Sequence, residues 1–198
     1  MKLLAFTDLH CDSEGLESIK KKIKENKIDF LICCGDASVW GNGLNEVAKE
    51  INKLNIITLI IPGNHETPEE VRKICNKYKN FINLHEVLYE FNDYTFVGFG
   101  TGGFSYTEPR LEKLIIEVNK KLNKEKKLIF VTHAPIYNTK LDYLYSSHRG
   151  CKSSRKFIEK FKPVITFCGH FHENENKKDK IKNSLIINPG HKGTLVEI

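Results

Sequence analysis

Five short apolar runs in this chain are each followed at once by residues that bind metal ions. The segments read LLAFTDLH, FLICCGD, IITLIIPGNH, LIFVTH and VITFCGHFH. One buried strand that ends in a polar residue is ordinary, whereas five such strands indicate side chains that converge at one edge of a sheet. Open α/β folds place their sites at that edge, beyond the carboxyl ends of the strands. The repetition therefore predicts an α/β fold with one polar site.

The first two thirds of the chain alternate between predicted strands and predicted helices. Hydrophobic periodicity gives these elements in turn, over residues 2–7, from about Ser13, over 28–34, 44–51 and 56–61, and from Thr67. Thr67-Pro68-Glu69-Glu70 has the form of a capping box with proline in the first turn of a helix. Alternation of this kind predicts a mostly parallel sheet.

The remainder of the chain has a different pattern. The predicted elements are a hairpin over 86–91 and 94–99, a helix over 108–123, a strand over 127–132, a helix near 154–161, a strand over 163–168, and short strands after Asn176. The hairpins indicate either one mixed sheet or a second sheet packed against the first, and the pattern alone leaves both open. No repeat or linker divides the chain, so we expect a single domain over residues 1–198.

Composition narrows the class of protein. The chain has 198 residues, of which 40% are hydrophobic and 28% charged, which is enough apolar material for a sizeable core. No apolar run approaches the ~20 residues of a membrane span, and the N-terminus lacks the pattern of a signal peptide. We therefore expect a cytoplasmic protein with no membrane partner.

The cysteines and the distribution of charge argue against other classes of protein. The six cysteines include no CxxC pair, which argues against a zinc ribbon or a thioredoxin motif, and nothing in the sequence suggests a disulfide framework. The net charge is +6, but the lysines are scattered and form no dense basic tract with aromatic residues. We therefore do not expect the protein to bind long nucleic acid.

The residues that follow the apolar runs form a coherent ligand set of two carboxylates, one amide and several imidazoles. They are Asp8, His10, Asp36, Asn64, His65, His133, His170 and His172. The set contains no thiolate, so it suits divalent Mn, Fe, Co, Ni or Zn better than it suits a structural zinc site. One carboxylate in such a set can bridge two ions. Two ions about 3.5–4 Å apart stabilise the attacking and the leaving oxygen of a displacement at phosphorus.

The motifs DLH, GD, GNHE, THAP and GHFH, in this order between Asp8 and His172, resemble the signature of the calcineurin-like metallophosphoesterases. The resemblance implies a four-layer αββα sandwich with two mixed β-sheets and the metal site at the C-terminal edge of the strands. It also implies a phosphoester hydrolase with two divalent metal ions, for which Mn is favoured over Fe, Ni, Co and Zn.

Residue roles carry over from the same resemblance. It implies that Asp8, His10 and His172 hold one ion, that Asn64, His133 and His170 hold the other, and that Asp36 bridges the two. His65 matches the family's catalytic histidine, which binds no metal and assists departure of the leaving group. A hydroxide that bridges the two ions would attack phosphorus in line. Glu66 is expected to support the site by orienting an imidazole.

Four residues outside the motifs are weaker candidates. His148 and Arg149 lie before a predicted helix, and we expect one of them to contact the substrate phosphate, although a solvent-facing loop is an equally good interpretation. Trp40 is the only tryptophan and could form a wall of the substrate cleft, with burial in the core as the alternative. His191 follows a Pro-Gly turn and lies either near the site or in the turn alone.

The substrate class follows partly from spacing. The stretches between the motifs leave little room for a cap domain or a DNA-binding insertion, which favours small phosphoester substrates over long nucleic acid. Phosphodiesters are slightly favoured over phosphomonoesters. The alternative function is a non-catalytic protein-binding scaffold on the same fold, but such scaffolds tend to lose motif residues and this chain retains them all. No pattern in the sequence defines an oligomeric state.

Overall fold

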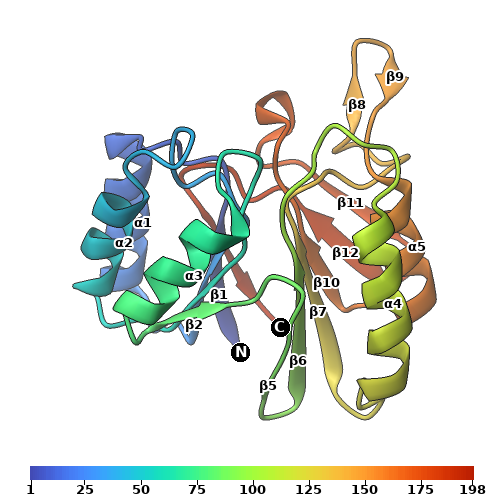
Figure 1. Ribbon diagram of the computed structural model, residues 1–198, viewed down its shortest axis with the longest axis horizontal. Coiled ribbons are helices and arrows are strands. Elements are labelled where there is room, and N and C mark those ends of the chain that lie inside the picture. The colour runs from blue at the N-terminus through green and yellow to red at the C-terminus, as the bar shows by residue number, and fades with distance from the viewer.

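Two β-sheets face each other and are covered on their outer sides by helices (Figure 1). The computed structural model describes residues 1–198. The first sheet has the strand order β13-β1-β2-β3-β4. Its strands are β1 Lys2–Phe6, β2 Phe30–Cys33, β3 Thr58–Ile60, β4 Phe81–Asn83 and β13 Thr194–Glu197. Strands β1 to β4 are parallel and β13 is antiparallel to β1, so the sheet is mixed.

The second sheet is also mixed and has the strand order β11-β12-β10-β7-β6-β5. Its strands are β5 Leu88–Phe91, β6 Tyr94–Phe99, β7 Lys127–Thr132, β10 Ile165–Phe167, β11 Lys178–Ile181 and β12 Ser184–Ile187. The inner strands are parallel, whereas β5 and β11 run antiparallel at the two edges. A separate hairpin joins β8 Tyr143–Leu144 to β9 Ser147–His148.

Five α-helices form the two outer layers. Helices α1 Ser13–Glu25, α2 Leu44–Asn52 and α3 Pro68–Lys77 cover the first sheet, and α4 Pro109–Lys121 and α5 Lys152–Phe161 cover the second (Figure 1). The expected capping box is present at α3, where the Glu70 N–H donates to Thr67 Oγ1 at 3.2 Å and the Thr67 N–H donates to Glu70 Oε2 at 2.7 Å. A single 3₁₀ turn covers His172–Asn174.

Three apolar clusters fill the three spaces between the layers. Successive residues of a strand point to opposite faces. Leu4 and Phe6 of β1 therefore belong to the cluster under α1 to α3, whereas Leu3 and Ala5 belong to the cluster between the two sheets. A third cluster lies between the second sheet and helices α4 and α5. This layering confirms the four-layer αββα sandwich.

Most predicted elements are confirmed, and the two sheets decide the question that periodicity left open. Four elements were not predicted, namely β4, the two strands of the β8–β9 hairpin and the 3₁₀ turn. Helix α5 begins at Lys152, two residues earlier than expected. None of the helices combines the length and the apolar character that a bilayer crossing requires.

Candidate metal centre

The predicted ligands lie in loops that follow parallel strands of both sheets. The loops after β1, β2 and β3 carry Asp8, Asp36 and Asn64, and those after β7 and β10 carry His133 and His170. Four predicted ligands have positive φ angles, which cost a non-glycine residue roughly 1–2 kcal/mol each. These are Asp8 at 52°, His10 at 45°, Asp36 at 53° and His170 at 72°. Such strain is typical of functional sites.

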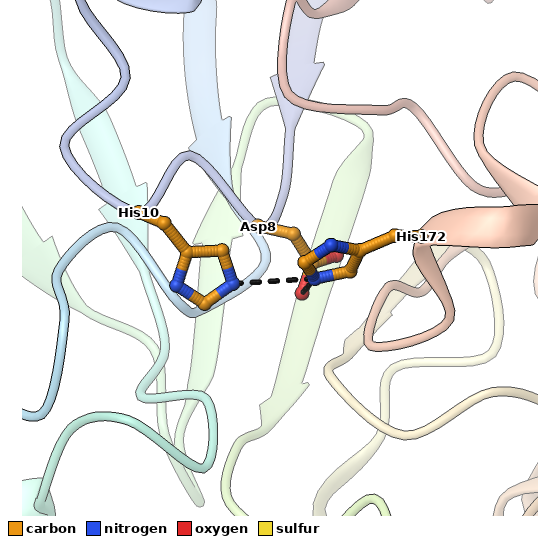
Figure 2. A group of neighbouring side chains, drawn as sticks. All are labelled: Asp8, His10 and His172. Atoms are coloured by element: carbon orange, nitrogen blue, oxygen red, sulfur yellow. Dashed lines mark hydrogen bonds and ion pairs between the residues drawn. The ribbon is translucent and has the colours of Figure 1, made fainter.

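One group of possible ligands consists of Asp8, His10 and His172 (Figure 2). The Nε2 atoms of His10 and His172 are 3.2 Å apart, and His172 Nε2 is 3.7 Å from Asp8 Oδ1. Asp8 Oδ2 accepts hydrogen bonds from Thr7 Oγ1 at 2.8 Å and from the His170 N–H at 2.9 Å. Asp8 Oδ1 is buried without any hydrogen-bond partner in the protein. A bound cation would satisfy this oxygen, which otherwise carries the cost of an unpaired buried acceptor.

A second group lies beside the first. Asn64 Oδ1 is 3.0 Å from His133 Nε2 and 2.8 Å from His170 Nδ1. Asp36 lies between the two groups, because its Oδ2 is 3.3 Å from His133 Nε2 and 3.9 Å from His10 Nε2. Its other oxygen, Oδ1, accepts the His65 N–H at 2.8 Å. One carboxylate oxygen of Asp36 can therefore contact ions in both groups.

Backbone carbonyls determine which ring nitrogens face the site. His10 Nδ1 lies 3.1 Å from the Ser38 carbonyl oxygen, and His133 Nδ1 lies 3.0 Å from that of Cys34. A carbonyl oxygen can only accept, so both Nδ1 atoms carry hydrogen and, in the neutral rings, both Nε2 atoms present lone pairs to the site. Those lone pairs converge with carboxylate and amide oxygens. A set of converging acceptors of this kind fits a pair of divalent cations.

The charge balance of the site agrees with this fit. Burial raises the pKa of Asp36, but the hydrogen bond and charge of His133 and the His65 N–H outweigh burial and lower the pKa to about 2. Burial lowers the pKa of His133, but the hydrogen bond to Asp36 and the charge of Asp8 outweigh it and raise the pKa to about 9. Burial and the charge of His133 lower the pKa of His170 to about 4. In the protein without metal, positive charge therefore resides on His133, beside the carboxylates that a cation would contact.

His65 is held differently from the other histidines. It forms a third group of possible ligand atoms with His10 and Asp36. Its Nδ1, however, accepts the Trp40 backbone N–H at 3.2 Å, which leaves Nε2 as the protonated nitrogen of the neutral ring. The Trp40 indole stacks on this imidazole at a centroid distance of 4.1 Å and an interplanar angle of 25°. Trp40 is 69% exposed, so it lies at the site and not in the core.

Glu66 supports the site in a different way from the one expected. Its carboxylate is buried and contacts no imidazole. Oε2 accepts the N–H groups of Asp36 and Gly63, both at 2.9 Å, and Oε1 accepts the Ser38 N–H at 2.8 Å and its hydroxyl at 2.6 Å. A side chain at Gly63 would overlap the Asp36 carboxylate, so glycine permits this close approach of the two loops. Glu66 thus ties the loop after β2 to the loop after β3.

The weaker candidates lie outside the ligand groups. His148 Nδ1 is 2.7 Å from Oδ1 of the buried Asp142, and His148 lines a cavity whose lining residues include no predicted ligand. Arg149 lines another cavity that also contains Phe171, the residue after His170. His191 Nδ1 bonds both carboxylate oxygens of Glu175, at 2.8 and 2.9 Å. The structure therefore brings neither His148 nor His191 into the ligand groups.

Several supporting groups were missed by sequence reasoning. The carbonyls of Cys34 and Ser38 orient two imidazoles, and no side-chain pattern reveals a backbone carbonyl. Thr7 bonds Asp8, and its position directly before that residue was a signal that could have been used. Asp142 accepts the N–H groups of Asn138, Thr139 and Gly150 and is bonded to His148, but the segment around it matches no predicted element or motif.

Comparisons with known proteins identify the family to which the chain is similar. Residues 1–174 match the family described as calcineurin-like phosphoesterase. MJ1162, an uncharacterised protein of Methanocaldococcus jannaschii, is 34% identical over 212 residues, which is 99% of this chain and 91% of that protein. A probable glycerophosphodiester phosphodiesterase GpdQ of Arcobacter nitrofigilis is 27% identical over 167 residues, or 74% of this chain and 57% of that protein. The crystal structure of TT1561 of Thermus thermophilus has a TM-score of 0.76 at 16% identity and covers 96% of this chain and 90% of its own.

Proposed function

Because the chain belongs to the calcineurin-like phosphoesterase family, we propose that it hydrolyses small phosphodiesters with the help of two divalent metal ions. The observation that carries this proposal is the position of Asp36. Its Oδ2 lies 3.3 Å from His133 Nε2 in one ligand group and 3.9 Å from His10 Nε2 in the other. A mononuclear site would not need a carboxylate between two complete groups of ligands.

Each side chain has a defined part in this proposal. Asp8, His10 and His172 would hold one ion, Asn64, His133 and His170 the other, and Asp36 both. Oxygen and imidazole donors of this kind suit Mn, which we favour among the divalent ions. Two bound ions would supply an activated water and would offset the charge that develops on the phosphoryl oxygens.

His65 would assist departure of the leaving group. Because the Trp40 N–H occupies Nδ1, the neutral ring carries its hydrogen on Nε2 and can donate it to a leaving oxygen. The stacked indole restricts rotation of the imidazole. Glu66 would touch neither ion nor substrate. Its hydrogen bonds hold the loop that carries Asp36 against the loop that leads to Asn64 and His65.

Two finer parts of the proposal rest on other observations. The preference for diesters over monoesters is supported by the relative named as a probable glycerophosphodiester phosphodiesterase. A cytoplasmic location is supported by the six cysteines, all of which are free thiols.

The proposal is tested with purified protein that is stripped of metal and reloaded with Mn, Ni, Co, Fe or Zn. We expect metal-dependent hydrolysis of a generic diester that exceeds hydrolysis of a generic monoester, with cyclic nucleotides assayed in parallel. Asp36→Asn is expected to abolish turnover and to weaken both metal sites. Asp93→Asn makes the same chemical change in an exposed turn and should retain full activity.

Two outcomes would contradict the proposal. Unchanged turnover of Asp36→Asn with full metal occupancy would refute the role of that carboxylate. Absence of hydrolysis with every metal and substrate would favour the non-catalytic protein-binding scaffold.

A further inference from the structure

A cavity of about 240 Å³ next to the metal centre is lined mainly by aromatic rings. We call it the aromatic pocket and define it by the side chains of Phe104, Tyr106, Tyr145, Arg149 and Phe171. Phe104 and Tyr145 are 79% and 78% exposed, although burial of a large ring is favourable. Clustered apolar groups that remain in water mark binding surfaces.

The aromatic pocket adjoins the metal centre directly. The Phe104 ring meets the His170 imidazole edge to face, at a centroid distance of 4.6 Å and an angle of 89°. A Cβ on Gly103 would lie 2.7 Å from His170 Cε1, so only glycine lets this loop approach the ligand so closely. Phe171 follows His170 in the chain, and their rings are 5.3 Å apart. A substrate whose phosphoryl group reaches the ions would therefore extend one substituent into this pocket.

The β8–β9 hairpin holds Tyr145 in an unfavourable backbone conformation. Tyr145 and Ser146 connect β8 to β9 and have φ angles of 48° and 63°. Two-residue turns with both φ angles positive strongly favour Asn-Gly or related pairs. A tyrosine at the first position does not stabilise a turn of this type, whereas its exposed ring lines the aromatic pocket. Strain of this kind is a reason to look for a function of the side chain.

Charge and size narrow the chemistry of the ligand. The Arg149 guanidinium lies 5.9 Å from the centre of the Tyr145 ring, and Lys152 Nζ lies 5.2 Å from that of Tyr106. These cations suit an anionic ligand that carries a planar ring. The volume is below the ~300–1,000 Å³ typical of a site for a whole drug-sized molecule. It therefore fits one substituent of the substrate and not the whole of it.

We propose that the aromatic pocket binds the base of a nucleoside whose phosphodiester lies at the metal centre. The proposal rests on the proposed function and specifies its substrate class. Stacking of a base on aromatic side chains tolerates any base, because every base presents a π face. Arg149 would contact the phosphate or the sugar. The sequence left open whether His148 or Arg149 contacts the substrate, and we now propose Arg149.

The first test compares three diesters that share the leaving group p-nitrophenolate and differ in the retained alcohol, which is thymidine (through its 5′ oxygen), benzyl alcohol or methanol. Since the leaving group is common, differences in kcat/KM report binding of the retained substituent. We expect the thymidyl ester to exceed the methyl ester roughly 5- to 100-fold, the range that stacking of one base supplies. Phe104→Ala and Tyr145→Ala should each lower this ratio several-fold, because each should lower kcat/KM for the thymidyl ester much more than for the methyl ester.

Tyr143→Ala is the matched control, because Tyr143 lies on the same hairpin but lines a different cavity. It should keep the wild-type ratio. A ratio near one, or an equal loss for both esters in the two pocket variants, would overturn the proposal. A benzyl ester that equals or exceeds the thymidyl ester would overturn the assignment of a nucleobase.

A second measurement is independent of turnover. Zinc-loaded protein is titrated with adenosine 5′-phosphorothioate or methyl phosphorothioate, and amide shifts are followed by NMR. Shifts at Phe104 and Tyr145 with the adenosine compound alone are the expected result, and equal shifts with both compounds would overturn the proposal. If no metal supports hydrolysis of any of the three diesters, the proposed function fails, while this titration still decides whether the pocket binds a base.

Discussion

At the scale of single residues, Asp36 and His133 form a pair whose charge would change if both residues bind metal as proposed. In the protein without metal, the carboxylate holds a proton on His133 and raises the pKa of that imidazole to about 9. An ion held by His133 as proposed would need the Nε2 lone pair, so the ion would displace the proton. Below about pH 9 the proton on His133 would compete with the metal, and above the pKa of His133 this competition would end.

Metal uptake at pH 7.5 should therefore release about one proton from His133. The apparent affinity should rise up to tenfold per pH unit and level off above about pH 9. Isothermal titration calorimetry in buffers of different ionisation enthalpy measures the released proton. His191→Asn, which lies outside the ligand groups, should release the same number as wild type. Identical binding enthalpies in all buffers would contradict the prediction.

Trp40 is a second residue with a distinct expected role, which is to position His65 and not to bind metal. Loss of the stacked indole should lower kcat, because the imidazole would sample orientations that do not reach the leaving oxygen. An aromatic pair contributes about 0.5–1.5 kcal/mol, so Trp40→Ala should lower kcat roughly 2- to 10-fold. KM for a small diester should change little, and Trp40→Phe should recover most of the loss. A change confined to KM, or no recovery by phenylalanine, would contradict this role.

At the scale of elements, the loops after β2 and β3 behave as one unit because Glu66 accepts four hydrogen bonds from them. Glu66→Gln replaces one acceptor oxygen with an amide N–H₂ that would face backbone N–H donors. We expect a loss of about 1–3 kcal/mol in the free energy of unfolding, because buried donors are left unpaired. Metal affinity should fall together with stability, since Asp36 lies on one of the two loops.

Chemical denaturation and metal titration of Glu66→Gln measure both effects. Glu69→Gln is the matched control, because Glu69 is an exposed residue in the first turn of α3 that bonds only Arg72. It should leave stability within about 0.5 kcal/mol of wild type. A Glu66→Gln variant with wild-type stability and metal affinity would show that the two loops need no such link.

Two features of the strands could not be predicted from local sequence patterns. Strand β1 was predictable because its apolar residues are local, but its antiparallel partner β13 lies at the other end of the chain. No local pattern specifies a partner at that separation. The β8–β9 hairpin was missed because Tyr145-Ser146 is not one of the pairs that mark a tight turn. That missed hairpin carries one wall of the aromatic pocket.

At the scale of the whole molecule, the apolar runs predicted a polar site at the edge of a sheet. They did not predict that two sheets pack face to face. Each apolar run indicated its own ligand, so the members of the candidate site could be named from the sequence. That the runs belong to two sheets instead of one was supplied by the family resemblance, since periodicity gives the face of a strand but not its sheet. The roles of Glu66 and Trp40 depend on contacts between loops and required the structure.

The two-sheet arrangement leads to a last prediction, because the proposed ligands come from both halves of the sandwich. Asp8, Asp36 and Asn64 follow strands of the first sheet, whereas His133 and His170 follow strands of the second. Ions held between them would join the two sheets at the edge of their apolar interface. An ion at 100 times its Kd stabilises the folded state by about 2.7 kcal/mol. For a protein of this size, one such ion should raise Tm by roughly 5–10 °C.

Differential scanning calorimetry at fixed free metal distinguishes the proposed ligands from His65, the proposed catalytic histidine. Asp36→Asn should lose most of the rise in Tm, because that carboxylate would contact both ions. His65→Ala should retain the full rise, because Nδ1 of His65 is occupied by the Trp40 N–H and the ring is not needed to hold either ion. Activity would be low in both variants, so the thermal shift and not turnover distinguishes their roles. A His65→Ala protein that loses as much of the shift as Asp36→Asn would identify His65 as a ligand and remove it from the leaving-group role.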